Sequence, residues 1–240
     1  METDFRQLQS IYAQIDEPDA VEGISTRLHI LDPEQQILEH KRAGRWTAAQ
    51  SWYELSLAEA PDDRDLQIKL LTCLKASNRF GTLLDFAQSL SIDYPASVAQ
   101  TVPFAAEAAW TTGRWDTLSR FLATDAGCAN HDFDTEVGRL FLSLQAKDSA
   151  RFNTLLTSMR DSIACGISSS TTTSLAAAHP LTIKLHVLYE LEQIGAVEAP
   201  NLSVDQLVER MDKRLDILGA LTADKQYLLG IRRAAMQLSR

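Results

Sequence analysis

The chain has 240 residues, of which 45% are hydrophobic and 23% are charged, a balance typical of a globular protein and not of a disordered one. Its net charge of −9 disfavours nucleic-acid binding, because an acidic surface does not gather around a phosphate backbone by releasing counterions. The excess of acid lies in residues 1–60, whereas residues 205–240 carry seven basic and five acidic side chains. A local nucleic-acid contact therefore stays open only at the C-terminal end.

The cysteines and the N-terminus indicate the cellular compartment. Cys73, Cys128 and Cys165 lie far apart, which argues against a disulfide framework or a zinc site and favours a reducing cytosolic or nuclear compartment. The acidic start of the chain, with no apolar segment after it, does not resemble a secretory signal. No apolar run reaches the roughly 18 residues that a transmembrane helix needs. We therefore expect an intracellular protein that has no membrane partner.

Residues 1–31 are expected to form an N-terminal helix and a corner at Asp16-Glu17-Pro18-Asp19. Three carboxylates here could serve acid–base chemistry or hold a cation, but the sequence offers no facing pocket. A helix start explains them better, with Asp16 as the cap and acidic side chains at the positive end of the helix dipole. Pro18 and Gly23 then bracket a short helical turn. This bracketing suggests the hypothesis of a rigid corner where the array of helices changes course.

A repeat of about 34 residues dominates residues 32–165. The triplets Gly44-Arg45-Trp46, Asn78-Arg79-Phe80 and Gly113-Arg114-Trp115 share a small–basic–aromatic pattern, and their arginines are separated by 34 and 35 residues. Pro61 and Pro95 are also 34 residues apart, and each follows a helical segment. This period is that of the tetratricopeptide helix–turn–helix unit.

Each part of the repeat has a physical role. The small residue can adopt the left-handed conformation that ends the first helix, the aromatic residue begins the second, and the proline ends it. Apolar residues recur at helical spacing within each unit, and a looser fourth hairpin is expected over residues 137–159 with its turn at Lys147-Asp148. The sequence predicts an all-α fold, an α-solenoid of antiparallel helix hairpins with tetratricopeptide-like repeats.

The repeat ends after residue 165, and residues 166–240 are expected to hold further helical hairpins. Gly166 to Thr173 is rich in Ser and Thr and is interpreted as a loop, and His179-Pro180 as a turn. Helices are expected through Leu191, from Ser203 to about Leu218, and from Thr222 to the chain end. The last helix carries apolar residues that would need a covering partner, so we expect a chain truncated at its C-terminus. These residues are Leu228, Leu229, Ile231, Met236 and Leu238.

No catalytic pattern is recognisable. The phosphate-binding, dinucleotide-binding, nucleophile-elbow, metalloprotease and kinase catalytic-loop motifs are all missing. His131-Asp132-Phe133-Asp134 could suggest a metal cluster, but a solvated polar turn explains it better. The tryptophans at 46, 52, 110 and 115 are expected to pack in the core. We therefore predict no catalytic residue, no cofactor and no metal, although a dispersed active site in a deep polar pocket stays an alternative.

The segment from Tyr12 to Gly23 reads YAQIDEPDAVEG, and it resembles a signature of the FAT region in ATR-type checkpoint kinases of the phosphatidylinositol 3-kinase-related family. The resemblance continues at residues 36–40, 107–110, 115–116 and 185–192, and departs at residues 125–135, 166–178 and 195–201. In overall character the chain is similar to filamentous-fungal members. The signature residues, candidates for structural or interaction roles, are Tyr12, Ile15, Asp16, Glu17, Pro18, Asp19 and Gly23.

The resemblance implies a role and not an active site. In such kinases the FAT region is a helical solenoid that clasps the kinase domain, contributes to dimer assembly and transmits activator signals. It implies a non-catalytic scaffold in a nuclear DNA-damage checkpoint serine/threonine kinase. The implied partners are the downstream FAT and kinase parts, a second protomer, and the ATR-interacting protein, which mainly engages other helical parts.

A stand-alone tetratricopeptide adaptor that binds short peptides is the alternative function. Such an adaptor clamps a carboxylate with Lys and Arg side chains that face inward from successive first helices. Lys41, Arg42, Lys69 and Lys75 are present but do not recur at one phase of the repeat. The sequence therefore favours the scaffold over the adaptor.

Overall fold

The computed structural model describes residues 4–5, 7–8, 11–12, 18–25, 36–37, 40–41, 44–170, 175–195, 204–218 and 221–238. The chain forms two compact units, residues 1–82 and residues 83–240. Throughout the described ranges every regular element is a helix, which confirms the predicted all-α class. None of the described helices combines the length and apolar character that crossing a lipid bilayer requires.

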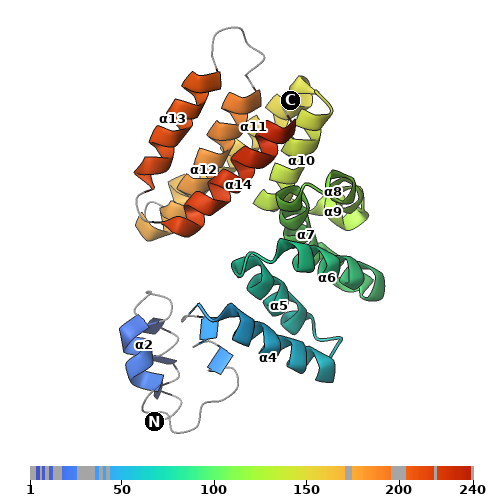
Figure 1. The fold of residues 1–240 in the computed structure, drawn as a ribbon, viewed down its shortest axis with the longest axis vertical. Helices are drawn as coiled ribbons and strands as arrows, with labels where there is room; N and C mark the ends of the chain where they lie inside the picture. Colours follow the sequence, from blue (N-terminus) through green and yellow to red (C-terminus); the bar gives the residue numbers. More distant parts are fainter. Residues whose placement is uncertain are drawn as a thin grey trace. The chain divides into compact units, whose positions relative to one another are not determined.

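The helices follow the predicted order. The first unit contains α2 (Pro18–Ser25), α4 (Trp46–Glu59), α5 (Arg64–Ala76) and the start of α6 (Phe80–Asp93). The second unit contains the rest of α6, then η1 (Pro95–Ser97), α7 (Val98–Thr112), α8 (Trp115–Leu122), α9 (Asp125–Ala129), α10 (Phe133–Gln145), α11 (Ser149–Ser170), α12 (Leu175–Gly195), α13 (Val204–Ile217) and α14 (Thr222–Leu238). Figure 1 labels the α-helices along the chain.

Four turns between helices share one backbone geometry. The angle φ is 66° at Gly44, 57° at Asn78, 73° at Gly113 and 55° at Lys147. These positions are separated by 34, 35 and 34 residues, so the fourth turn keeps the period although its residue is lysine. In each turn the next residue donates its N–H back to the helix: Arg45 to His40 (2.8 Å), Arg79 to Leu74 (3.0 Å), Arg114 to Ala109 (2.8 Å) and Asp148 to Ser143 (3.0 Å).

This geometry is the Schellman motif, in which a left-handed residue lets the chain satisfy carbonyl groups that the helix end leaves open. The triplets thus end one helix and begin the next, as predicted. The predicted role of the prolines is also confirmed, because α4 ends at Glu59 before Pro61 and α6 ends at Asp93 before Pro95. The tetratricopeptide-like hairpins therefore rest on local backbone chemistry.

In the first unit α4 and α5 form an antiparallel hairpin. Ala49 and Tyr53 of α4 are buried, and α5 buries Leu70, Leu71 and Leu74. The Cys73 thiol donates to the carbonyl of Trp46 at 3.4 Å, and burial raises the pKa of this thiol. Asp63 caps α5 by accepting the N–H groups of residues 65 and 66.

The signature block is only partly described. Pro18 is the first residue of α2 and Asp19 lies in its first turn, as a helix start requires. Gly23 lies inside α2, which continues to Ser25, so the expectation that it closes a short turn is wrong. Ile15, Asp16 and Glu17 lie outside the described residues, as does the expected helix start at Asp32-Pro33.

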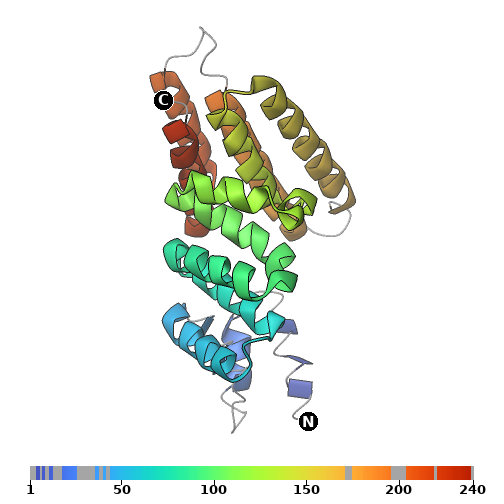
Figure 2. The same ribbon diagram turned by 90° about the vertical axis from the view of Figure 1, so that its right-hand side faces the viewer.

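In the second unit neighbouring helices pack as hairpins, α7 with α8, α10 with α11 and α11 with α12, and α7 also packs on α10 (Figure 2). The predicted core residues of these helices are largely confirmed. Side chains at most 7% exposed include Ala108, Trp110, Leu118, Phe121, Leu122, Val137, Leu140, Phe141, Phe152, Leu156 and Met159.

The loop expected from Gly166 is wrong for residues 166–170, because α11 continues to Ser170, and the boundary expected at residue 165 falls inside this helix. Packing outweighs the poor helix propensity of Gly and Ser here. A Cβ on Gly166 would lie 3.5 Å from Leu181 of α12, and the Ser168 hydroxyl bonds back to the Ala164 carbonyl. Residues 171–173 lie outside the described ranges.

A further expectation is corrected. His179 and Pro180 lie inside α12 and do not form a turn, and His179 Nε2 lies 2.9 Å from Asp224 Oδ2 of α14. A contact within the second unit thus accompanies a helix at the point where the sequence offers Pro180 as a helix breaker. The segment from residue 125, where the resemblance to the family departs, contains the short helix α9, which Thr124 caps by accepting the Gly127 N–H.

We expected the apolar residues of the last helix to lack a covering partner within the chain, but two of them are buried. Leu228 is 2% exposed and Ile231 is fully buried, whereas Leu229 is 43% exposed. The second unit therefore covers one face of α14 itself, and Leu229 marks the opposite face.

Replacing Lys147 by glycine should stabilise the chain. A left-handed non-glycine residue costs about 1–2 kcal/mol, and part of that is offset by the greater entropy of Gly in the unfolded chain, so we expect a gain of about 1 kcal/mol. Urea unfolding followed by circular dichroism measures the change. Gln145→Gly, in the preceding helical turn, is the matched control and should lose about 0.5–1 kcal/mol. A Lys147→Gly variant no more stable than the parent would contradict the strained turn.

Candidate interaction surface

The last helix, α14, returns to pack on α7, α10 and α12 (Figure 1). The Tyr227 hydroxyl donates to Asp134 of α10 at 2.5 Å, across 93 residues of sequence. The Arg233 guanidinium donates to the carbonyl of Thr111 at the end of α7 at 2.7 Å. This helix therefore joins parts of the second unit that are distant in sequence.

An aromatic cluster fills the junction between these helices. The Trp110 ring lies 5.6 Å from Phe141 and 6.1 Å from Tyr227 between centroids, and Trp115 lies 5.8 Å from Phe141. The tilted and edge-on geometries are the ones that aromatic pairs prefer. Trp110 is 2% exposed, which confirms core packing for this tryptophan.

Tyr227 stands in an acidic environment. Burial and the negative charges of Asp134, Glu107 and Asp132 raise its pKa well above the ordinary value. The phenol therefore stays protonated and donates to Asp134. Its role is that of a structural hydrogen-bond donor, because a raised pKa removes it from acid–base chemistry near neutral pH.

A buried ion pair links α12 and α14. The Arg232 guanidinium donates to both carboxylate oxygens of Glu190, at 3.2 and 3.0 Å, and Glu190 is 2% exposed. Arg232 also reaches Asp212 of α13 at 2.8 Å. Burial lowers the pKa of Arg232, but the hydrogen bonds and charges of Glu190 and Asp212 outweigh it and raise the pKa overall. The Arg232 guanidinium therefore connects three helices, α12, α13 and α14.

A second arginine fixes α13 on α12. The Arg214 guanidinium carbon lies 3.9 Å from the Tyr189 ring centroid, and its Nη2 lies 3.2 Å from His186 Nδ1. Burial and the Arg214 charge lower the pKa of His186, whereas Glu190 acts in the opposite sense. The imidazole therefore stays neutral beside the arginine, as this contact requires.

The polar side chains of the His131–Asp134 segment have partners within the second unit. Asp132 caps α10, Asp134 binds Tyr227, and His131 Nδ1 lies 2.9 Å from Glu136. Arg139 binds Glu136 and the carbonyls of residues 127 and 130, which holds the end of α9 against α10. In the part of the chain that the structure describes, no group of His, Cys, Asp or Glu side chains could hold a metal ion.

The lysines that an adaptor groove would use have local partners. Lys41 Nζ lies 3.5 Å from the Tyr53 hydroxyl, and Lys69 pairs with Asp65 at 2.6 Å. The triplet arginines act between repeats instead: Arg79 donates to Gln50 at 3.2 Å and Arg114 to Asp85 at 3.1 Å, each 29 residues back. These contacts do not form a carboxylate clamp.

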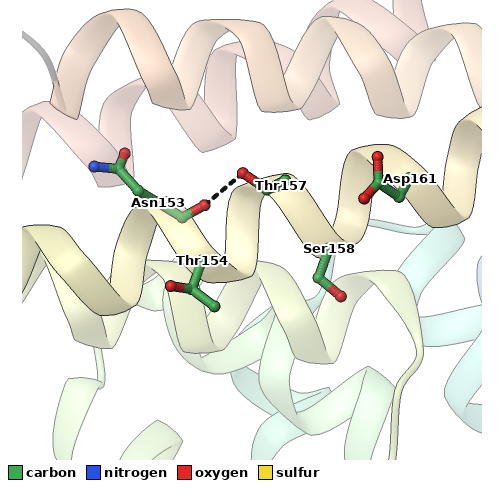
Figure 3. Close-up of a pocket in the computed structure, with 5 residues that line it drawn as sticks. All are labelled: Asn153, Thr154, Thr157, Ser158 and Asp161. Carbon is green, nitrogen blue, oxygen red and sulfur yellow. Dashed lines mark hydrogen bonds between the residues drawn. The ribbon is translucent and has the colours of Figure 1, made fainter.

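Two hollows border α11. The larger, of about 580 Å3, lies over its outer face, where Figure 3 shows Asn153, Thr154, Thr157, Ser158 and Asp161 along one side of the helix. The smaller, of about 370 Å3, lies between α10, α11 and α12. Among the described residues, no serine or threonine hydroxyl that lines either hollow is hydrogen-bonded to a histidine or a carboxylate.

The helix hairpins, the period near 34 residues and the closing last helix define an all-α repeat protein of the tetratricopeptide-like class. The family model described as FAT domain matches residues 102–240, more than half of the chain and all within the second unit. The model described as the M-HEAT region of serine/threonine-protein kinase ATR matches residues 1–40. The chain therefore belongs to the FAT domain family.

The relatives are long kinases. Protein kinase rad3 of Schizosaccharomyces pombe is 27% identical over 230 residues, which cover 95% of this chain and 9% of that protein. Serine/threonine-protein kinase ATR of Oryza sativa subsp. indica is 25% identical over 250 residues (97% of this chain, 9% of the relative), and that of Arabidopsis thaliana is 25% identical over 202 residues (81% and 8%). The predicted resemblance to the FAT region of ATR-type kinases is confirmed, and the likeness to filamentous-fungal members stays a prediction.

The long-range polar contacts of α14 were not predicted from the sequence. Glu190 lies at helical spacing from the buried Val187 and Ile194, and Arg232 from Leu228 and Ala235. A charged residue on an apolar helix face signals a buried partner, and these two have opposite sign. That pattern could have identified the pair, whereas nothing in the spacing points from Tyr227 to Asp134.

Removing the buried cation should destabilise the second unit. Arg232→Met leaves the Glu190 carboxylate buried without its partner, and such a loss costs about 3–5 kcal/mol. The double variant Arg232→Met, Glu190→Gln should recover part of that loss, because the remaining group is neutral. Urea unfolding measures both. Arg210→Met, at an exposed site on α13, is the control and should change stability by less than about 0.5 kcal/mol. Equal losses in Arg232→Met and the control would contradict the role of the pair.

Proposed function

We propose that this chain is a non-catalytic scaffold and regulatory segment of the FAT region of an ATR-type serine/threonine kinase, acting in the nuclear DNA-damage checkpoint. The observation that carries the proposal is the agreement between the FAT match at residues 102–240 and the unit closed by α14. A closed helical unit resists deformation, so it can carry a displacement from one surface to another. The relatives' names as kinases support the assignment of the parent.

The proposed partners are the remaining FAT and kinase parts of the parent, a second protomer and the ATR-interacting protein. The contact with the parent is assigned to the outer face of α14. Leu229, 43% exposed, lies on that face with the exposed Gln226 and Arg233. An apolar side chain with polar neighbours suits a contact that forms after each part has folded.

The signature residues Tyr12, Ile15, Asp16, Glu17, Pro18, Asp19 and Gly23 are proposed as a structural corner that also offers contacts to the parent. Support comes from the place of Pro18 as the first residue of α2, a position that proline favours in helices. The double variant Glu17→Lys, Pro18→Ala should lower the melting temperature, because it removes the proline at the helix start and places a cation at the positive helix end. An unchanged melting temperature in a thermal scan would count against the corner.

The function is tested by capture of the separately expressed downstream FAT–kinase segment of the parent, with light scattering to give the stoichiometry. We expect a one-to-one complex that Leu229→Glu weakens at least tenfold while the melting temperature stays within a degree or so, because the side chain is exposed. Leu55→Glu, an exposed leucine of α4 outside the FAT match, is the matched control and should bind normally. No complex with the parent chain, despite a folded protein, would sink the proposal.

A further inference from the structure

The smaller hollow beside α11 has the features of a pocket that could hold one apolar side chain of a ligand. Its floor is apolar, with Met159 and Ile163 of α11 7% and 6% exposed and Leu181 of α12 beside them. Phe133, the first residue of α10, forms a further apolar wall. A volume of about 370 Å3 is large enough for one large side chain and part of its neighbours.

One cation stands at this pocket. Lys184 Nζ lies 5.1 Å from the centroid of the Phe133 ring, and no carboxylate of the described residues lies within ion-pairing distance of it. Two carboxylates also line this pocket. The charge of Glu136 is paired with Arg139, and Asp132 accepts the Asp134 N–H as the cap of α10. Lys184 is the cation among the lining residues that can pair with a ligand carboxylate.

The larger hollow continues from this pocket along the same helix. Ser158 lines both hollows, so the apolar floor and the polar face of α11 adjoin at this residue. The Thr154 and Thr157 hydroxyls donate to their own helix backbone, whereas the Ser158 hydroxyl and the Asn153 amide have no hydrogen-bond partner among the described residues. These groups can bond the backbone of a bound chain.

We propose that the groove formed by the two hollows binds a short peptide segment with a large apolar side chain next to a carboxylate. The apolar side chain fills the floor between Phe133, Ile163 and Leu181, and the carboxylate pairs with Lys184. The peptide backbone then lies along α11 and bonds to Ser158 and Asn153. These residues differ from the lysines of a tetratricopeptide carboxylate clamp, and the inference does not depend on the proposed function.

The test uses the full 240-residue chain and three blocked pentapeptides: one with a central phenylalanine between two aspartates, one with asparagines in place of the aspartates, and one with a central alanine. Binding is followed by methyl NMR titration of the isoleucine and methionine resonances. We expect saturable shifts at Ile163 and Met159 with the first peptide, at least fivefold weaker binding of the asparagine peptide, and no binding of the alanine peptide.

Variants separate the site from non-specific association. Lys184→Gln should abolish the preference for the aspartate peptide, and Lys184→Arg should retain it. Ser158→Trp should block the groove. Lys213→Gln, an exposed lysine of α13, and Ser119→Trp, an exposed serine of α8, are matched controls that should bind as the parent does. Each variant is accepted when its circular dichroism and melting temperature match the parent. Absence of saturable shifts with the phenylalanine–aspartate peptide, equal binding of the asparagine peptide, or unchanged selectivity in Lys184→Gln would overturn the proposal.

Discussion

The contact of α14 with α7 and α10 is the constraint on which the second unit depends. Tyr227 brings a phenol against Asp134, and its ring completes the aromatic cluster around Trp110. A chain of hairpins that touch only their neighbours can bend at every interface, because no contact spans more than one unit. A helix that returns across 93 residues removes that freedom for the hairpins between its contacts. The FAT match lies within this unit, so the family region coincides with the part closed in this way.

The buried ion pair acts together with this contact. Burying Glu190 and Arg232 costs desolvation, which their mutual attraction offsets only in a well-hydrogen-bonded geometry. Two hydrogen bonds between them and a third to Asp212 provide that geometry. An apolar substitute could slide along the helix surface, whereas a bidentate guanidinium fixes the register of α14 on α12. The pair is thus better understood as a determinant of register than as a source of stability.

The turns and the core faces could be predicted from the sequence because they are encoded locally. The Schellman turn is encoded within three positions, by a residue that accepts the left-handed conformation followed by an arginine and an aromatic residue. This triplet recurs with the period of the repeat, which makes it recognisable. The prediction failed where tertiary contacts outweigh a local preference, as at Gly166 against Leu181 and at Pro180 inside α12. It also left out Tyr227–Asp134, since residues 93 positions apart share no spacing rule. The Arg232–Glu190 pair was left out as well, because its signal is a charge of opposite sign on each of two apolar helix faces and not a spacing. The hollow with Lys184 is formed by three helices together, so no local sequence pattern could predict it.

The return of α14 also decides which of its residues can serve an external partner. Leu228 and Ile231 follow the face that packs inside the unit, and Leu229 lies about 100° around the helix from Leu228. A sequence that offers Leu228, Leu229 and Ile231 together reads as one apolar patch, but the fold divides it into a core face and an outer face. A charge at Ile231 would test the fold, and a charge at Leu229 would test assembly. Because Leu228 and Leu229 are adjacent in sequence but lie on different faces of α14, the internal packing of the unit and the proposed contact with the parent chain can be changed independently.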